Sequence, residues 1–266
     1  MAVLLGSSVK VLTIPIYSSQ TWTPPYNGTG VIHCIGAGGA GRDDATNTRS
    51  GGAGGYCQKA VSFSTGTDWT LVVGAGGSGA GGETTAADGT HALDSNGGNA
   101  ASSTNASGNG GTATGGDTNR TGGAGGEGGG GAVGVFATGE AGQTYRGGTS
   151  DARGPAFDSA GVLSGGGVGG VKGITAGYGP STTYYNTPYG SRQAQYAGGG
   201  GGAFGGDGGF LSGGGSVYTN GNGTTDGLAG YGGIGGGGGG TRCSPGTGRP
   251  GYGGDGMILI QYLTVG

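Results

Sequence analysis

The sequence predicts a mainly non-helical fold, a bundle of polyglycine-II helices with a small antiparallel β-sheet at one end. Glycine supplies 81 of the 266 residues, several times its usual share of about 7 per cent. These glycines are concentrated in Gly-Gly-X tracts with a period of three, and short strand-like runs flank the tracts. Only 9% of the residues are charged and the net charge is -3, so the high net charge typical of disordered chains is missing.

The three-residue period recurs in four separate tracts: GGAGGY at 51–56, GGAGGEGGGG at 122–131, GGVGGV at 166–171 and YGGIGGGGGG at 231–240. A polyproline-II backbone has three residues per turn, whereas an α-helix repeats every 3.6 residues and a strand every two. Glycine on two of three faces lets neighbouring helices approach until the N–H groups of one tract reach the carbonyls of the next. A flexible glycine-rich linker is the alternative, but a linker does not keep its X positions in phase.

Four apolar runs are typical of strands, and they could form one small sheet at one end of the bundle. They are 31–35, 56–63, 69–73 and 257–262, and STGTD at 64–68 is typical of a hairpin turn between the second and third runs. Much of the remaining apolar and proline content falls before residue 31. We therefore expect residues 1–30 to be an attachment segment and 31–266 to be a glycine-rich domain with variable loops.

Composition and spacing argue against several classes of protein. Eight prolines and many adjacent glycines exclude a collagen triple helix, and 11 scattered basic residues argue against nucleic-acid binding. No apolar run approaches the roughly 18 residues that span a membrane, so we expect no membrane insertion. Lys10 interrupts the first apolar stretch, which is therefore not a convincing signal peptide, and we expect synthesis in the cytoplasm.

Side chains that could support catalysis are few. His33 falls in a strand-like run and His91 in a polar segment, and neither has a metal-ligand or Ser-His-Asp pattern near it. We therefore expect no enzymatic activity, no cofactor and no metal. Cys34 and Cys57 lie in the first two strand-like runs, where we favour two buried thiols over a disulfide, because a cytoplasm is reducing.

The segments between the tracts indicate a binding function. Five of the 13 tyrosines fall within 19 residues, mixed with serine, asparagine, glycine, proline and arginine, as in binding loops. The alternative is that these tyrosines pack onto a fold that is short of apolar side chains. The candidate residues of this region are Tyr178, Tyr184, Tyr185, Tyr189, Arg192 and Tyr196.

Three stretches of the chain resemble the glycine-rich domain of phage tail proteins: SQTWTPPYNGTGVIHCIGAGGAG, GGAGGYCQKAVSFSTGTDWTLVVGAGG and GYGGDGMILIQY. The chain is also similar to the polyglycine-II tip adhesins of T-even-like phage tail fibres. The resemblance implies a virion protein at a tail-fibre or spike tip, in which polyglycine-II rods carry loops that bind the host surface. The implied partners are a surface polysaccharide or outer-membrane protein and, through residues 1–30, other fibre or tail proteins.

Counting chain reversals from the sheet predicts which loops share the binding end. The count places 41–50, 83–96, 175–196 and 241–250 at the end opposite the sheet, and it leaves 132–164 undecided. It adds Arg42, Asp43, Asp94 and Arg242 to the candidate receptor-binding residues. Two other functions stay open at this point: a capsid decoration or structural fibre protein, and an ice-binding protein.

Overall fold

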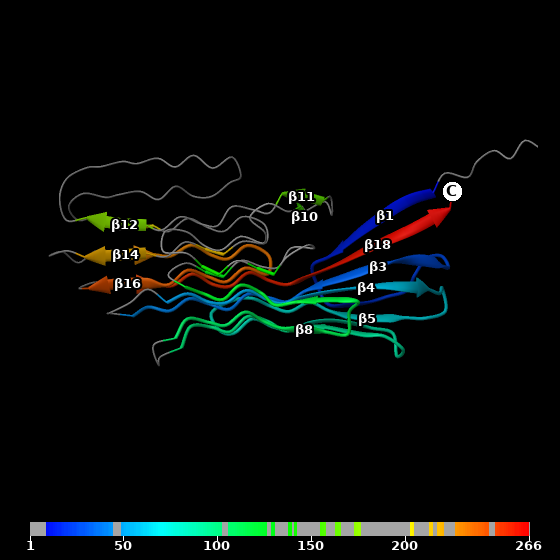
Figure 1. Cartoon of the computed structure of the whole chain (residues 1–266), viewed down its shortest axis with the longest axis horizontal. Coiled ribbons are helices and arrows are strands. Elements are labelled where there is room, and N and C mark those ends of the chain that lie inside the picture. Colours follow the sequence, from blue (N-terminus) through cyan, green and yellow to red (C-terminus); the bar gives the residue numbers. More distant parts are fainter. Residues whose placement is uncertain are drawn as a thin grey trace, which may run out of the picture.

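The structure, a computed structural model, is built from β-strands and extended glycine tracts. It describes residues 9–44, 49–102, 106–126, 129–130, 138–139, 141–142, 155–157, 163–165, 173–176, 203–204, 213–214, 217–220, 227–244 and 248–265. Every regular element in these ranges is a strand. A β-sandwich forms one end, short parallel strands form the other, and glycine tracts join them (Figure 1). The predicted non-helical fold with antiparallel sheet is confirmed.

Two antiparallel sheets of five strands make up the sandwich. Sheet 1 has the order β1 (Val9–Ile16), β18 (Met257–Val265), β3 (Gly28–Ile35), β4 (Tyr56–Phe63) and β9 (Thr118–Arg120). Sheet 2 has the order β2 (Gln20–Trp22), β5 (Trp69–Val72), β6 (Thr84–Ala87), β7 (Ala92–Ser95) and β8 (Ala113–Thr114). A separate hairpin joins β10 (Pro155–Phe157) to β11 (Leu163–Gly165).

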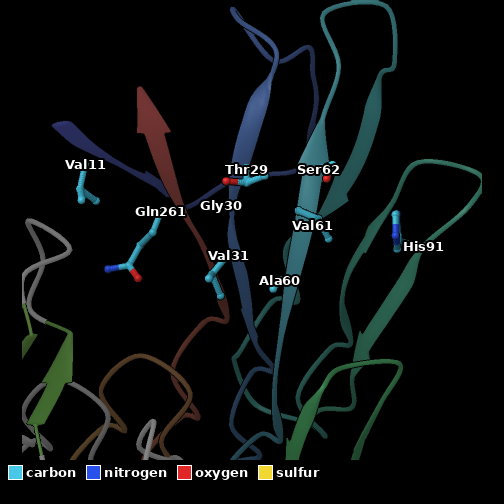
Figure 2. A pocket seen from close by; sticks show the side chains of 9 residues that line it. All are labelled: Val11, Thr29, Gly30, Val31, Ala60, Val61, Ser62, His91 and Gln261. Carbon is cyan, nitrogen blue, oxygen red and sulfur yellow. The ribbon is translucent and has the colours of Figure 1, made fainter. Parts of the chain in front are cut away.

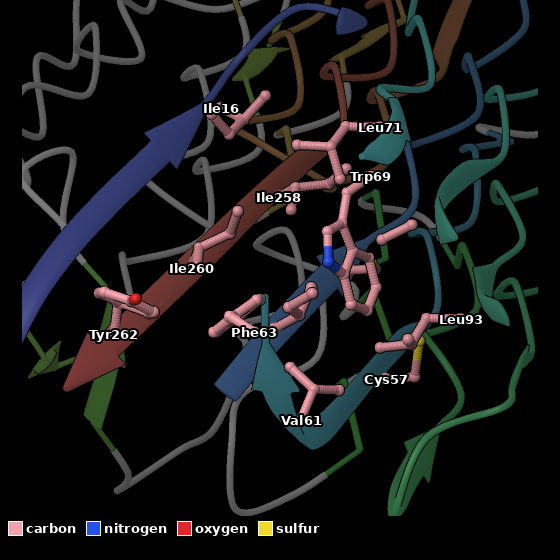
Figure 3. Close-up of a cluster of buried hydrophobic side chains, with 13 residues drawn as sticks. Ile16, Cys57, Val61, Phe63, Trp69, Leu71, Leu93, Ile258, Ile260 and Tyr262 are labelled. Atoms are coloured by element: carbon pink, nitrogen blue, oxygen red, sulfur yellow. The ribbon is translucent and has the colours of Figure 1, made fainter. Parts of the chain in front are cut away.

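An apolar core fills the space between the two sheets (Figure 3). Alternate residues of each strand face inward, so β4 contributes Val61 and Phe63 while β5 contributes Trp69 and Leu71. The Trp69 side chain is fully buried, and its ring lies edge to face with Phe63 at 5.9 Å between centroids. The sandwich therefore has an ordinary side-chain core, although the chain as a whole is poor in apolar residues.

The four predicted strands are all present, but they do not form one sheet. Residues 56–63 are β4 as expected, and the other three runs correspond to β3, β5 and β18. The run at 69–73 starts β5 in sheet 2, because the 64–68 turn carries the chain across to the opposite sheet. Residues 9–22 contribute β1 and β2, so this part of the predicted attachment segment belongs to the sandwich.

Glycine tracts leave the sandwich and hydrogen-bond mainly to one another, although Gly236 donates to Gly233 within its own tract. From 36 to 41 the backbone N–H groups donate in turn to three neighbouring tracts. Gly36 and Gly39 donate to the carbonyls of Gly55 and Gly52, which lie on the first neighbour. Ala37 and Ala40 donate to the carbonyls of residues 82 and 79 on the second neighbour. Residues 38 and 41 donate to the carbonyls of residues 254 and 251 on the third neighbour. The three-residue period of the sequence is thus the period of these bonds.

Close approach between backbones explains why glycine is required in these tracts. A methyl group on Gly39 would overlap the carbonyl of Asn99, and one on Gly52 would overlap the carbonyl of Asn109. Ala37 and Ala53, which also belong to these tracts, are fully buried. The X positions of the repeat are therefore packing positions in this region and not solvent-facing ones.

Two sets of short parallel strands form the end away from the sandwich (Figure 1). Outgoing strands make one three-stranded sheet, β12 (Gly173–Ala176), β14 (Val217–Asn220) and β16 (Thr241–Ser244). Returning strands make the other, β13 (Ala203–Phe204), β15 (Gly227–Leu228) and β17 (Gly248–Arg249). Neighbouring strands in each set run in the same direction, so both sheets are parallel.

The two cysteines of the sandwich are free thiols, which confirms that prediction. Cys34 on β3 and Cys57 on β4 are directly opposite in the register, and both are fully buried. A hydrogen bond with Cys57, together with burial, raises the pKa of the Cys34 thiol well above its usual value.

His33 is a sheet residue, as predicted, and it is enclosed by polar neighbours. Its Nδ1 lies 2.8 Å from the Tyr56 hydroxyl and its Nε2 lies 3.3 Å from Oε1 of Gln261. The Tyr56 hydroxyl also donates to Oε1 of Gln58 at 2.8 Å. Burial, opposed in part by the bond to Gln261, lowers the pKa of His33 to about 4.

We expect this buried imidazole to make the protein less stable in acid. The unfolded chain takes up a proton near pH 6.5, whereas the folded chain does so only near pH 4. The free energy of unfolding should therefore fall as the pH drops from 6.5 to 4, by about 3 kcal/mol in all. Denaturant titrations across this range should show a shallower fall for His33→Gln than for the native protein. Equal slopes would contradict this assignment.

Candidate binding site at the end remote from the sandwich

The end opposite the sandwich brings together several segments that are far apart in sequence. We call it the distal end, and its described residues are 42–44, 49 and strands β12 to β17. Each outgoing strand and its returning strand bracket one of the sequence interruptions: 177–202, 221–226 or 245–247. The tract that starts at Gly36 reaches the same end, because Asp43 forms a parallel bridge to Thr241 of β16.

A short hairpin closes the first tract at the distal end, within the predicted 41–50 loop. Arg42 and Arg49 form an antiparallel bridge, and the Arg42 N–H donates to the Arg49 carbonyl at 2.9 Å. Nε of Arg49 donates to Oδ2 of Asp44 at 2.9 Å, and the side chain of Arg49 is only 7% exposed. This nearly buried ion pair fixes the base of the hairpin, and Arg49 is thereby a structural residue.

Thr241 joins the hairpin to the outgoing strands. Its N–H donates to the Arg42 carbonyl at 2.9 Å, and its Oγ1 donates to Oδ1 of Asp43 at 2.7 Å. Gly248 lies against the same pair, because a methyl group at Gly248 would overlap both oxygen atoms. Asp43, Thr241 and Gly248 are thus in direct contact, and Arg42 joins them through its backbone bond to Thr241.

Arginines flank this contact on each contributing segment. Arg42 precedes Asp43, Arg242 follows Thr241, and Arg249 follows Gly248. Arg42 and Arg249 are exposed and Arg242 is half-buried. The structure thus brings Arg42, Asp43 and Arg242 together at the distal end. Arg249 lies within the predicted 241–250 loop but was not among the candidate receptor-binding residues.

Asp94 does not belong to this group, and the prediction of a distal loop at 83–96 is wrong. These residues form the β6–β7 hairpin of sheet 2, in which Asp94 pairs with Thr85. The Cys57 thiol donates to the Asp94 carbonyl at 3.6 Å, which places Asp94 beside the sandwich core. The chain turns back earlier than the count assumed, because Gly82 donates to Ala75 and residue 77 has a φ of 127°.

The side chain of Asp94 lies close to a second carboxyl group, that of Glu83. Its Oδ1 is buried without a hydrogen-bond partner among the described residues. A hydrogen bond with Asp94 raises the pKa of the Glu83 carboxyl above its usual value.

The six remaining candidates, Tyr178, Tyr184, Tyr185, Tyr189, Arg192 and Tyr196, lie outside the described residues. The strands that bracket them, β12 and β13, both belong to the distal end.

A separate hollow of about 700 Å³ lies on the sandwich, away from the distal end (Figure 2). Its lining is mainly apolar with a few hydroxyl, amide and imidazole groups: Val11, Thr29, Gly30, Val31, Ala60, Val61, Ser62, His91 and Gln261. His91 is held by Asp88, whose Oδ2 lies 3.1 Å from Nδ1, and its ring stacks on Trp69. The hollow contains none of the predicted site residues.

Among the described residues no group of three or more histidine, cysteine, aspartate or glutamate side chains is arranged to hold a metal ion. None of the described ranges includes a helix of the length and hydrophobicity needed to cross a membrane.

Comparison with known proteins agrees with this architecture of strands and glycine tracts. A family model described as a glycine-rich domain matches residues 15–263. The chain therefore belongs to this glycine-rich domain family, and the match begins within β1 and ends within β18. The search of curated proteins found no match.

Proposed function

We propose that this protein is a phage adhesin, a non-catalytic receptor-binding protein at the tip of a tail fibre or spike. In this proposal the distal end recognises the host cell surface, through a polysaccharide or an outer-membrane protein. The observation that carries it is that strands β12 to β17, which bracket three sequence interruptions, lie with the Arg42–Arg49 bridge at one end of a long scaffold. Binding residues are commonly found on loops that a rigid framework positions.

We further propose that the framework is a polyglycine-II bundle. The support is the alternation of N–H donors from 36 to 41 among three neighbouring tracts, which repeats after three residues. The tract at 51–55 has the same alternation. Its residues 52 and 55 donate to the carbonyls of residues 99 and 96, whereas residues 51 and 54 donate to those of residues 238 and 235. A helix with three residues per turn, whose hydrogen bonds run to neighbouring tracts, has the geometry of polyproline II without its prolines.

Such a framework suits an adhesin because it separates attachment to the fibre from binding of the receptor. The sandwich, which contains the first described strand and the last, would join the protein to the rest of the fibre. The tract from Gly36 to Arg42 would span roughly 20 Å at a rise of about 3.1 Å per residue. The binding residues would then be held well away from the attachment end, on the outside of the virion.

The proposal is tested by whole-cell binding of the purified protein. A panel of bacterial strains that includes the host should adsorb the labelled native protein selectively. The triple variant Tyr184→Ala, Tyr185→Ala and Tyr189→Ala should bind host cells at least tenfold more weakly, because hot-spot tyrosines each contribute about 2 kcal/mol or more. A matched variant, Tyr231→Ala with Tyr252→Ala, removes an exposed aromatic pair on the tracts and should bind normally.

Folding is checked separately, since both variants should keep the denaturation midpoint of the native protein. Failure of the native protein to bind any strain would reject the adhesin proposal. Unchanged binding by the triple variant would remove these tyrosines from the site. Labelling on virions would distinguish an adhesin at a fibre tip from a structural protein along a fibre or on the capsid.

A further inference from the structure

Charge is distributed unevenly between the two ends of the molecule. Among the described residues the distal end carries four arginines and two aspartates: Arg42, Arg49, Arg242, Arg249, Asp43 and Asp44. The rest of the described chain has three basic and six acidic residues. The described part of the distal end is thus net positive by two charges on a chain whose net charge is -3.

Both aspartates of the distal end are occupied by internal partners. Asp44 accepts from Nε of Arg49 at 2.9 Å, and Asp43 accepts from Oγ1 of Thr241 at 2.7 Å. Within the described residues, Arg42 and Arg249 form no ion pair, and both are exposed. Arg42 and Arg249 are therefore exposed cations without an ion-pair partner among the described residues, and Asp43 stays a charged, exposed carboxylate beside Arg42.

The backbone also holds Arg42, Arg242 and Arg249 close together. Arg42, Arg242 and Arg249 each adjoin a residue of the Asp43, Thr241 and Gly248 contact. Their backbones are fixed by the Arg42–Arg49 bridge, by pairing of Arg242 with 218, and by pairing of Arg249 with 228. A guanidinium group binds carboxylate or phosphate with two parallel hydrogen bonds, so an ordered set of them favours a polyanion.

We propose that the distal end binds an anionic polysaccharide, one with carboxylate or phosphate groups, through Arg42, Arg242 and Arg249. This inference rests on the proposed adhesin function and adds the chemical class of the receptor. The acidic sandwich end would be repelled by such a surface, so the molecule would approach with its distal end forward. An uncharged polysaccharide would lack the anionic groups that the arginines recognise.

The test measures affinity for polymers of defined charge. Polygalacturonate supplies carboxylates, dextran phosphate supplies phosphates, and plain dextran is the uncharged reference. We expect the native protein to bind both charged polymers but not dextran, with an affinity that falls as NaCl rises from about 50 to about 300 mM. The preferred polymer distinguishes a carboxylate receptor from a phosphate receptor.

Two variants locate the binding. Arg42→Ser with Arg249→Ser should lower the affinity about 100-fold, roughly tenfold for each charge-assisted contact. Lys59→Ser removes one half-buried positive charge, which pairs with Asp117 on the sandwich, and should leave the affinity unchanged. Arg42→Lys with Arg249→Lys should recover only part of the loss, because an ammonium group lacks the planar fork.

The outcomes separate this inference from the adhesin proposal. Strong host-cell binding that the double serine variant does not reduce would overturn the inference and leave the adhesin proposal standing. Absence of host-cell binding by the native protein would reject the adhesin proposal, while the polymer assay would still decide the arginine site. Equal affinity for duplex DNA and for both acidic polysaccharides would also overturn the inference, since it would indicate an unselective polyanion surface.

Discussion

A Gly39→Ala substitution should destabilise the protein by about 4 kcal/mol, more than a small side chain ordinarily costs. The added methyl group would overlap the Asn99 carbonyl, and backbone atoms cannot move aside as a flexible side chain can. Gly39 also donates to Gly52 and accepts from Gly238, so a shift would strain bonds to two further tracts. Denaturant unfolding, followed by far-UV circular dichroism, should show a large decrease in the midpoint.

Gly79→Ala is the matched control for this variant. A methyl group at Gly79 would meet nothing within 4 Å, yet the residue belongs to a neighbouring segment and accepts a bond from Ala40. Its stability should stay within about 0.5 kcal/mol of the native value or rise slightly, because alanine restricts the unfolded chain. Equal stability of the two variants would mean that the tracts are not packed backbone to backbone.

Trp69→Ala should cost about 3–5 kcal/mol by opening a cavity between the two sheets of the sandwich. The side chain is fully buried, contacts the Phe63 ring edge to face, and stacks on the His91 ring at 5.8 Å between centroids. The chain has two tryptophans, so fluorescence of the remaining Trp22 reports the unfolding of the variant directly.

Tyr26→Ala is the corresponding control, since this aromatic side chain is 64% exposed. Its carbonyl, which accepts a hydrogen bond from the Tyr262 hydroxyl, is retained in the variant. We expect its stability to change by less than about 0.5 kcal/mol. If Trp69→Ala were as stable as Tyr26→Ala, the core between the sheets would not be the one that the structure places there.

The sequence predicted the parts of the fold whose residues are apolar. Residues 56–63 were predicted as a strand with the observed bounds because buried Val61 and Phe63 alternate with polar residues. The β6–β7 hairpin was missed because its strands are mostly threonine and alanine, with Leu93 as the main apolar residue. Asp88 and Gly89, with a φ of 86° at the glycine, form a turn that the Asp-Gly pair could have revealed.

Residues of the candidate site could be placed from the sequence only where every reversal of chain direction could be recognised. The reversal between Ala75 and Gly82 has no proline and no polar cluster, so it resembles the tracts around it in sequence. Missing that single turn moved Asp94 to the wrong end. Arg42, Asp43 and Arg242 were placed together because the first and last tracts run directly from strands of the sheet.

The three-residue period also determines which insertions and deletions the scaffold can accommodate. Adding three residues to a tract returns each N–H to the same neighbour, whereas adding one or two would turn alanine faces toward carbonyls that admit only glycine. Between an outgoing strand and its returning strand, insertions need not come in multiples of three residues. The excursions between outgoing and returning strands contain 26, six and three residues, yet their strands keep a common register. Exchange of one excursion for another of any length would therefore leave the phase of the framework unchanged.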